Sequence, residues 1–266
     1  MLALVAGRGR LPVYLADRLE ARGVDFRIFS LSGFEIDANC GRTAETFRIE
    51  NLGSFLQRLR GERFEEVCFA GAIQRPALDP GQIDAATLPL VPRMVEAIGR
   101  GDDGALRVVL ELFEEHGLAI RAAHEIAPEL LPRTGVATRK RPAGSHLRDA
   151  AIGDAVLEQL GRDDQGQACV IANGREVARE DAAGTDAMLG RLAGQANGGI
   201  LFKAPKPGQD RRIDLPTIGP QTVAATHAAG LDGIVIAAGG VLVVDAQRVV
   251  KDCDRLGLFL LVREAV

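Results

Sequence analysis

Residues 2–31 have the sequence LALVAGRGRLPVYLADRLEARGVDFRIFSL, and this stretch decides the fold class. The apolar run Leu2–Ala6 stops at the GRG of residues 7–9, as a buried parallel strand does when it ends in a tight turn. Leucines at helical spacing then predict a helix over Leu11–Arg22. Phe26–Leu31 predicts a second strand. A strand, a helix and a strand in this order indicate a βαβ unit with a parallel sheet.

The same alternation continues through the first half of the chain. Glu66–Ala70 predicts a further strand, and Asn51 is a suitable N-cap for a helix that carries leucines and a phenylalanine at helical spacing. Two more helices are expected over Leu88–Ile98 and Ala105–His116, with a turn at residues 100–104 between them. We therefore expect a Rossmann-like α/β domain.

Domain organisation follows from a change in composition after about residue 128. Residues 129–146 are rich in proline, glycine and basic residues, which is typical of a surface linker. A second α/β pattern follows, with a hairpin of the strands Ala168–Ala172 and Arg175–Arg179 around Asn173-Gly174. The sequence thus predicts an N-terminal domain over residues 1–128, a linker over 129–146 and a catalytic domain over 147–266. We expect the ligand cleft to lie between the two α/β domains.

Composition narrows the class of protein. The chain has 266 residues, of which 47% are hydrophobic and 26% charged, as in ordinary globular proteins. Its net charge of −4 argues against nucleic acid as a partner, so an anionic ligand needs a local group of basic residues. Four widely spaced cysteines predict reduced, structural thiols. No signal peptide and no apolar run of about 20 residues is present, so we expect a cytoplasmic protein.

Two glycine turns are candidate anion sites. Gly9 lies at the start of the first predicted helix, whose N-terminal amides and dipole attract negative charge. Gly71 follows another apparently central strand, and in a doubly wound sheet it would lie beside Gly9. A tight turn without a ligand would have the same sequence, because this segment is neither a complete G-x-G-x-x-G nor a P-loop.

Two further segments carry acidic residues at predicted helix starts. In the GDDG of residues 101–104, Asp103 and its neighbour Asp102 are suited either to capping a helix or to binding a divalent cation. In the GTDAM of residues 184–188, Thr185 is a suitable N-cap and Asp186 favours the first turn. The alternative at this second segment is that the same groups contact a ligand.

The strongest chemical signal is KAPKPGQDRRIDLPTIG, residues 203–219. It places four basic residues and two aspartates within twelve positions, and its prolines stiffen the backbone. Hydrolysis of a phosphoric anhydride needs cations on the phosphates, a carboxylate that binds a metal or deprotonates water, and a hydroxyl that orients an oxygen. The residues expected in these roles are Lys203, Lys206, Arg212, Asp214 and Thr217. A solvated basic loop is the alternative.

Other enzyme classes lack their signatures. The four histidines show no metal-binding spacing, and a G-x-S-x-G nucleophile elbow is absent. A NAD-dependent dehydrogenase would carry an acidic residue at the end of the second strand, where this chain has Leu31-Ser32-Gly33.

Taken in order, the segments AGRGRLP, FAGAIQRP, GDDGALR, HEI, GTDAML, KAPKPGQDRRIDLPTIG and LGLF give the chain a family resemblance. It resembles the UDP-2,3-diacylglucosamine pyrophosphatases of lipid A biosynthesis, in their two-domain form unrelated to the calcineurin-like phosphoesterases. The resemblance extends over essentially the whole chain. The combination of KAPKP and DLPTIG is specific, whereas glycine turns alone are not.

The resemblance implies an Mg²⁺-dependent hydrolase that converts UDP-2,3-diacylglucosamine into UMP and 2,3-diacylglucosamine 1-phosphate (lipid X). It implies that catalysis depends on Asp214, and we expect this carboxylate to be the metal ligand or to orient the attacking water. The chain departs from some relatives at Arg8, Arg10 and Ala72, so only backbone contacts are carried over at the neighbouring glycines. The expected substrate-binding residues are Gly9, Gly71, Asp103, Thr185, Asp186, Lys203, Lys206, Arg212 and Thr217.

The expected partner is a small-molecule lipid-sugar nucleotide. Peripheral contact with the inner membrane and a homo-oligomer are left open by the sequence. The main alternative is a non-catalytic module that binds a nucleotide sugar, in which the turns hold phosphate and the basic loop closes over it. Hydrolysis distinguishes the two, since binding alone releases no UMP.

Overall fold

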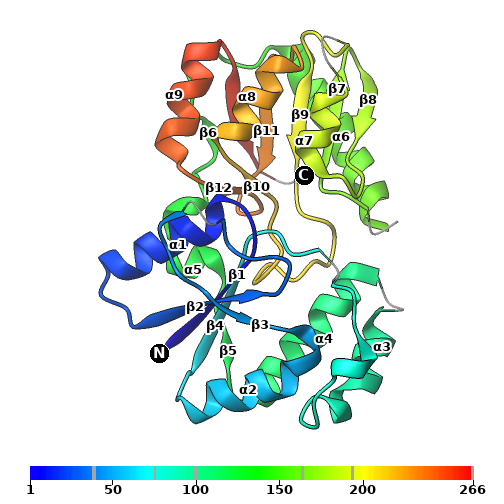
Figure 1. The fold of residues 1–266 in the computed structure, drawn as a ribbon. Coiled ribbons are helices and arrows are strands. Elements are labelled where there is room, and N and C mark those ends of the chain that lie inside the picture. The colour runs from blue at the N-terminus through cyan, green and yellow to red at the C-terminus, as the bar shows by residue number, and fades with distance from the viewer. Residues whose placement is uncertain (38–39, 75, 99–100, 163–164, 193–194, 265–266) are drawn as a thin grey trace. The chain divides into compact units, whose positions relative to one another are not determined.

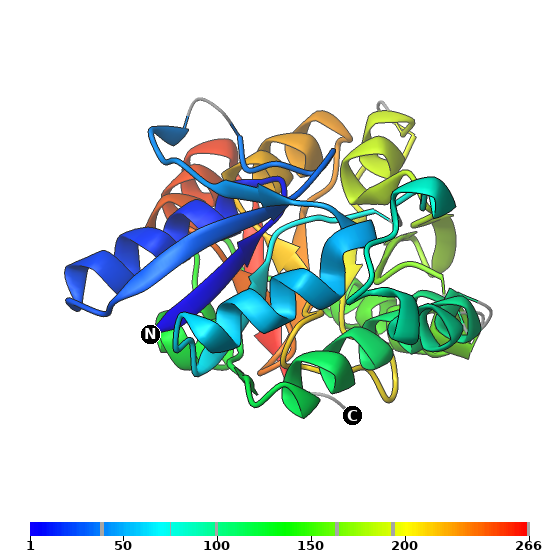
Figure 2. The same ribbon diagram turned by 60° about the horizontal axis from the view of Figure 1, so that its bottom comes forward.

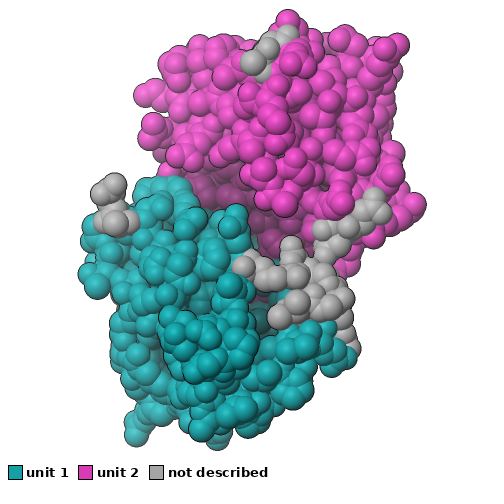
Figure 3. All heavy atoms as spheres, turned by 45° about the vertical axis from the view of Figure 1, so that its right-hand side comes forward, with its two compact units in different colours: residues 1–128 teal, residues 129–266 magenta. Residues whose placement is uncertain are grey.

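The chain forms two compact units. The computed structural model describes residues 1–266 except 38–39, 75, 99–100, 163–164, 193–194 and 265–266, and describes only the backbone at 97–98 and 101–103. Unit 1 is Met1–Pro128 and unit 2 is Glu129–Val266 (Figure 3). Among the described residues, no helix has both the length and the apolar character that crossing a membrane requires.

Within the described residues, unit 1 contains a five-stranded parallel sheet in the order β3-β2-β1-β4-β5 (Figure 1). The predicted strands β1, β2 and β4 are confirmed, and the order reverses at β1 as in a doubly wound fold. Two short strands at the sheet edges, β3 and β5, have no clear signal in the sequence. The bounds are β1 Leu2–Ala6, β2 Phe26–Leu31, β3 Glu45–Phe47, β4 Glu66–Ala70 and β5 Ala119–Ile120.

Helices cover both faces of this sheet (Figures 1 and 2). On one face, the Phe29 ring of β2 meets Phe55 of α2 edge-on at 5.2 Å between centroids, and Phe69 of β4 meets Phe113 of α4 at 5.0 Å. The helix α1 lies on the other face, beside α5. The bounds are α1 Arg10–Ala21, α2 Leu52–Gly61, α3 Val91–Ile98, α4 Gly101–Glu115 and α5 Ala123–Ile126, with 3₁₀ turns at Ile49–Asn51, Pro80–Gln82 and Leu88–Leu90.

One local prediction in unit 1 is wrong, and another is confirmed in position but not in its side-chain contact. The turn expected at residues 100–104 is not a turn over its whole length, because α4 begins at Gly101 and continues through Gly104. A glycine inside a helix costs only about 1 kcal/mol, less than the burial of residues such as Phe113 contributes. Asn51 takes the predicted N-cap position of α2, but its side chain does not cap the helix. It donates to Asp84 instead, and the Thr87 hydroxyl accepts the Gly53 N–H at 2.8 Å.

Unit 2 contains, within the described residues, a mixed six-stranded sheet in the order β6-β13-β11-β9-β7-β8. Strands β9, β11 and β13 are parallel, whereas β7 is antiparallel to β9 and forms the predicted hairpin with β8. A separate parallel pair consists of β10 and β12. The bounds are β6 Gly135–Val136, β7 Ala168–Ala172, β8 Arg175–Arg179, β9 Ile200–Lys203, β10 Thr217–Ile218, β11 Gly233–Ala237, β12 Leu242–Val243 and β13 Phe259–Arg263.

The alternation of side chains along each strand separates two cores in unit 2. Ile200 and Phe202 of β9 pack in the core that includes residues of α6, while Leu201 packs in the core beneath α7, α8 and α9. Lys203, two residues after Leu201, therefore belongs to the face covered by α7. The bounds are α6 Gly144–Arg162, α7 Gly184–Gly190, α8 Pro220–Ala228 and α9 Ala246–Leu256, with a 3₁₀ turn at Pro128–Leu130.

The linker predicted over residues 129–146 is instead an integral part of unit 2. Its residues 135–136 form the edge strand β6 against β13, and α6 begins at Gly144. The buried Thr138 hydroxyl accepts the Leu260 N–H at 2.9 Å and donates to the Lys140 carbonyl at 3.1 Å. Proline and glycine set the turns here, but backbone pairing with β13 fixes the segment.

We expect Thr138→Val to destabilise unit 2 by about 1–3 kcal/mol. Valine keeps the shape of threonine but leaves the Leu260 N–H without its acceptor in a buried position. Hydrogen exchange measured by NMR should show faster exchange of the Leu260 amide. Thr138→Ser keeps the hydroxyl and serves as the control. Equal protection of Leu260 in the valine and serine variants would contradict this role.

Candidate functional site

In unit 1, the turn after β1 and the turn after β4 are joined by backbone hydrogen bonds. The Arg8 N–H donates to the Ala72 carbonyl at 3.0 Å, and the Ala72 N–H donates back to the Arg8 carbonyl at 2.9 Å. These turns lie at the carboxyl ends of neighbouring strands, where the strand order reverses. Such a switch point is where open α/β sheets bind ligands. The structure therefore brings Gly9 and Gly71 to the same edge of the sheet, as expected.

Gly71 and Gly9 are required for different reasons. Gly71 has φ +88°, and a Cβ there would lie 2.7 Å from the Arg8 carbonyl oxygen and 2.7 Å from Cγ of Pro12. No other residue fits this contact between the turns. Gly9 has φ 98° and ψ −178°, a combination that is essentially limited to glycine, but no atom lies within 4 Å of a Cβ built there. The space beside Gly9 leaves the start of α1 approachable.

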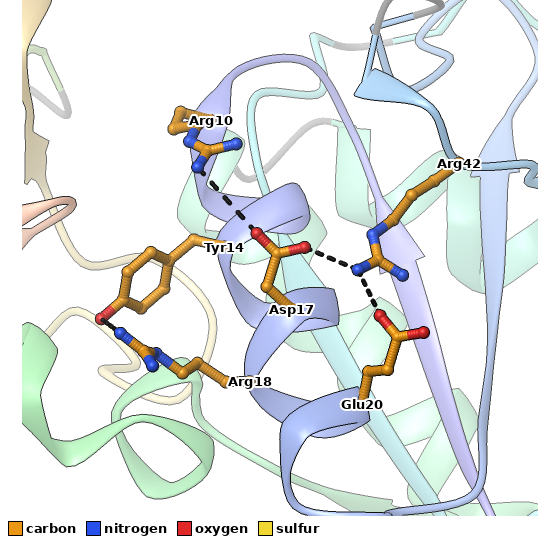
Figure 4. A network of polar contacts seen from close by, with 6 residues as sticks. All are labelled: Arg10, Tyr14, Asp17, Arg18, Glu20 and Arg42. Carbon is orange, nitrogen blue, oxygen red and sulfur yellow. Dashed lines mark hydrogen bonds and ion pairs between the residues drawn. The ribbon is translucent and has the colours of Figure 1, made fainter.

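Arginine side chains around this edge have protein partners. The Arg8 guanidinium donates to the Gly33 carbonyl at 2.8 Å and lies over the Phe34 ring, so it ties the turn after β1 to the loop after β2. Arg10 lies 3.9 Å from Asp17 on the surface of α1, and Asp17 also accepts from Arg42 (Figure 4). Both arginines thus contribute to the structure of unit 1.

In unit 2, three polar residues gather at the carboxyl end of β9. Lys203 is the last residue of β9 and pairs with Ala168, the first residue of the antiparallel β7. Gln167 immediately precedes β7, and Glu180 immediately follows β8. Because both partner strands are antiparallel to their neighbours, these three positions meet at one edge of the sheet. The Glu180 N–H donates to the Ala168 carbonyl at 2.9 Å and fixes this register.

A chain of hydrogen bonds begins at the Lys203 ammonium. Its Nζ donates to the Thr185 hydroxyl at 2.7 Å, and the hydroxyl in turn donates to Oε1 of Glu180 at 2.5 Å. The other Glu180 oxygen, Oε2, accepts the Gln167 backbone N–H at 2.6 Å. Lys203 and Thr185 are both buried. We call Lys203, Thr185, Glu180, Gln167 and Asp214 the β9-end network.

Asp214 joins this network through a side-chain amide. Its Oδ2 accepts from Nε2 of Gln167 at 3.3 Å and also from Nε2 of Gln209. The Gln209 side-chain oxygen accepts the Lys206 N–H at 3.0 Å, so Gln209 braces the loop on which Asp214 lies. Two amide donors on one oxygen orient the carboxylate. The loop thus holds Asp214 at the carboxyl end of β9.

Burial and nearby carboxylates act in opposite directions on Lys203. Burial lowers the pKa of the ammonium below its ordinary value, because the charged form loses its hydration. The carboxylates of Glu180 and Asp186 act to raise the pKa, since they favour the positive charge. Asp186 therefore lies within electrostatic reach of Lys203. A buried cation with a polar network is suited to stabilising negative charge.

Two further predicted site residues, Arg212 and Thr217, have local partners. Arg212 forms a two-pronged ion pair with Asp210 at the exposed tip of the loop, with Nη2 to Oδ2 at 2.7 Å. The Thr217 hydroxyl donates to the Leu215 carbonyl at 3.3 Å within its own turn. The side chain of Asp103 lies outside the described residues, and its backbone is in the first turn of α4. Roles for these three in ligand binding stay predictions.

The sequence predicted Thr185 as the N-cap of α7, and this prediction is wrong. The helix begins at Gly184 with Ala183 at the N-cap position, and the Asp181 side chain accepts the Ala183 N–H at 2.9 Å. Thr185 instead places its hydroxyl between Lys203 and Glu180. The Thr185 side chain thus bonds to residues that are distant in the sequence and does not cap its own helix.

Three polar residues of this site were not predicted from the sequence: Gln167, Glu180 and Gln209. A signal for two of them was present in the predicted hairpin. The ends of its strands lie opposite each other, so the residue before Ala168 and the residue after Arg179 must be neighbours. Gln209 lies within the basic loop, but nothing in its spacing indicates that it contacts Asp214.

The described residues hold no preformed metal centre. No group of three or more His, Cys, Asp and Glu side chains in this part of the chain is placed to bind an ion. What the β9-end network offers is the oriented carboxylate of Asp214 and the buried ammonium of Lys203 at a sheet edge. That pair suits chemistry on a phosphate ester or anhydride, in which charge develops on oxygen. The expected ligand cleft between the domains stays a prediction.

Comparison with known proteins covers both units. The family model described as the LpxI N-terminal domain matches residues 1–130, and that of the LpxI C-terminal domain matches residues 133–261. The UDP-2,3-diacylglucosamine pyrophosphatase LpxI of Caulobacter vibrioides is 40% identical over 269 residues, which cover 98% of this chain and 96% of that protein. A solved UDP-glucose 4-epimerase of Thermus thermophilus with NAD is 16% identical over 100% of this chain and 86% of its own, with a TM-score of 0.31, too low to support an argument. The chain belongs to the LpxI family.

Proposed function

We propose that this chain is a hydrolase that cleaves the pyrophosphate bond of UDP-2,3-diacylglucosamine in lipid A biosynthesis. Support comes from the 40% identity to the Caulobacter vibrioides pyrophosphatase over nearly the full length of both proteins. The products are UMP and 2,3-diacylglucosamine 1-phosphate. Water adds to one phosphorus, the bridging oxygen leaves with the other phosphate, and the water protons are lost to the site and to solvent.

The observation that carries this proposal is the placement of Asp214 and Lys203 in one hydrogen-bonded network. A carboxylate held by two amides can orient an attacking water or a metal ion. The Lys203 ammonium supplies positive charge from a buried position at the end of β9. Low polarity there strengthens its attraction to negative charge. Lys206 and Arg212 on the same loop are proposed to neutralise the phosphates, and Thr185 and Asp186 to complete the substrate site with Thr217.

Gly9 and Gly71 are proposed as backbone contacts for an anionic part of the substrate. Their turns lie at the switch point of the unit 1 sheet, and the approachable start of α1 provides a positive dipole. Asp103, in the first turn of α4, is proposed as a further contact to the substrate.

Magnesium is the proposed cofactor. Mg²⁺ in proteins is commonly held by one or two carboxylates together with substrate phosphates and water, rather than by a cage of side chains. A single oriented carboxylate at Asp214 fits this mode, with the pyrophosphate supplying further oxygens. When bound there, the ion would neutralise charge on the phosphates. The sequence lacks the Asp-x-His and Gly-Asn-His-Asp-Glu segments of the calcineurin-like phosphoesterases, which supports a separate type of enzyme.

The site of action is proposed to be the cytoplasm, with peripheral contact at the inner membrane. A diacylated substrate resides in a membrane, so the enzyme must approach that surface to take it up. The four widely spaced cysteines, all free thiols in the structure, are typical of a protein in a reducing compartment such as the cytoplasm.

Removal of divalent cations tests both the activity and the cofactor. The purified chain with UDP-2,3-diacylglucosamine should release UMP in the presence of Mg²⁺, and EDTA should reduce the rate at least about a hundredfold, because charge neutralisation by the ion is lost. Excess Mg²⁺ should restore the rate, and EDTA already saturated with Mg²⁺ is the control. Binding of the substrate without release of UMP would favour the non-catalytic nucleotide-sugar module. A rate of UMP release that EDTA does not change would contradict the proposal that Mg²⁺ is the cofactor.

A further inference from the structure

We propose that Glu180 is a positioning residue that fixes the Lys203 ammonium through the hydroxyl of Thr185. Two hydrogen bonds make up this path: Lys203 Nζ donates to Thr185 Oγ1 at 2.7 Å, and Thr185 Oγ1 donates to Glu180 Oε1 at 2.5 Å. The inference rests on the proposed function in that Lys203 is expected to act on the phosphates. Glu180 itself does not touch the substrate in this assignment.

Glu180 is rigidly held, which a positioning residue must be. Its backbone N–H donates to the Ala168 carbonyl, and its Oε2 accepts the Gln167 N–H at 2.6 Å. These two contacts anchor the residue to the start of β7 from both its main chain and its side chain. With Oε2 committed to Gln167, Oε1 is directed at Thr185.

The direction of each hydrogen bond explains why a carboxylate is needed at position 180. The Lys203 ammonium has only donors, so Thr185 must accept from it and has its own proton to donate onward. That proton goes to Oε1 of Glu180, while the Gln167 N–H donates to Oε2. Both neighbours of the carboxyl group are therefore donors, and only a group with two acceptor oxygens satisfies both.

The Glu180→Gln variant should lose the hydrogen bond from the Thr185 hydroxyl and keep the hydrogen bond from the Gln167 backbone N–H. The backbone N–H of Gln167 cannot change direction, so the new amide oxygen must face it. The amide NH₂ group then faces Thr185, whose hydroxyl loses its acceptor. The negative charge near Lys203 is lost as well. Thr185→Val removes the same hydrogen bond by deleting its donor. Thr185→Ser keeps the hydroxyl and should therefore keep the hydrogen bond to Glu180.

Measurements of kcat should show that Glu180 and Thr185 act on Lys203 through the same hydrogen bonds. Glu180→Gln should lower kcat for UMP release about a hundredfold, the effect expected when a catalytic cation is misplaced by a small distance. Thr185→Val should cause a similar loss, and the double variant should be no slower than either single one, because both changes break one path. Glu176→Gln is the matched control: it makes the same charge change on β8, where Glu176 pairs with Arg179 at 2.6 Å on the surface.

The titration of Lys203 provides a readout that does not depend on activity. The chain has four lysines, at 140, 203, 206 and 251, so NMR of protein labelled at the lysine Cε gives few signals. The signal that is missing from the spectrum of the Lys203→Arg variant is the signal of Lys203. The charged groups that act on Lys203 are Glu180 and Asp186, both of which raise the pKa of its ammonium. Loss of Glu180 should therefore lower the pKa of Lys203 further, with the Lys206 signal unchanged.

The same shift should appear in the pH profile of kcat. If the charged form of Lys203 is active, the decline of kcat on the alkaline side should move to lower pH in Glu180→Gln and stay in place in Glu176→Gln. A purely structural defect would lower kcat without moving this limb.

The outcomes separate this inference from the proposed function. A Lys203 titration that is the same in wild type, Glu180→Gln and Glu176→Gln overturns the role of Glu180, whatever the activities are. Additive losses in the Glu180→Gln/Thr185→Val double variant overturn it too. A wild-type chain that releases no UMP while Glu180→Gln still lowers the pKa of Lys203 overturns the proposed function and leaves the link between Glu180 and Lys203 supported.

Discussion

Replacement of Asp214 by asparagine is expected to lower kcat for UMP release about a thousandfold, with the chain still folded and still able to bind substrate. A loss of this size corresponds to about 4 kcal/mol of activation free energy, within the range for removal of a general base or a carboxylate that binds a metal. Asparagine keeps an acceptor oxygen for the Gln167 and Gln209 amides, so the loop should keep its conformation. The change removes the charge and replaces the second carboxylate oxygen with an amide NH₂ group.

Single-turnover release of UMP measures the chemical step, and a binding titration with the substrate measures affinity. Asp252→Asn makes the same chemical change on α9, where the carboxylate pairs with Arg255 at 3.0 Å, and it should leave kcat unchanged. If Asp214→Asn turns over at the wild-type rate, Asp214 has no part in catalysis and the proposed function loses the observation that carries it.

Replacement of Gly71 by alanine should have the largest effect on the stability of unit 1. The new Cβ would lie 2.7 Å from the Arg8 carbonyl oxygen and from Cγ of Pro12, and the residue would be held at φ +88°. Backbone strain of this kind costs about 1–3 kcal/mol, and overpacking costs a similar amount. We expect a decrease of about 4 kcal/mol in the free energy of unfolding.

The chain offers a specific probe for this measurement. It has one tyrosine and no tryptophan, and Tyr14 is buried on α1, where its hydroxyl accepts from Arg18 at 3.2 Å. Tyrosine fluorescence during denaturation therefore reports on unit 1 within the full chain. Gly61→Ala is the control, because no atom lies within 4 Å of its Cβ and it ends a helix. An unchanged midpoint for Gly71→Ala would show that the two turns separate at little cost.

Much of the fold could be predicted because its elements have strong local signals. The apolar runs of β1, β2 and β4 are bounded by turn residues, and the Asn173-Gly174 pair indicates the β7–β8 hairpin without reference to the rest of the chain. Predictions failed where a weak local preference met a tertiary contact. The turn preference of the glycines near the start of α4 is small beside the packing of that helix.

The candidate site divides in the same way. The sequence indicated Asp214 and Lys203 because charged residues braced by prolines form a local pattern. It indicated Glu180 and Gln167 only indirectly, through the predicted hairpin, since neither has a special neighbour in the sequence. Their importance comes from strand pairing, which places the end of β8 and the start of β7 beside the end of β9.

The sequence by itself determined the two α/β halves, the family and the charged loop, because strand and helix periods, turn residues and a long motif are all local properties of the chain. Only the tertiary structure decided that residues 129–146 belong to unit 2, and that Thr185 joins Lys203 to Glu180 rather than capping α7. Those outcomes depend on which buried donors find acceptors once the sheet has formed. Hydrogen bonds between distant residues have no period along the chain, so only the packed sheet reveals them.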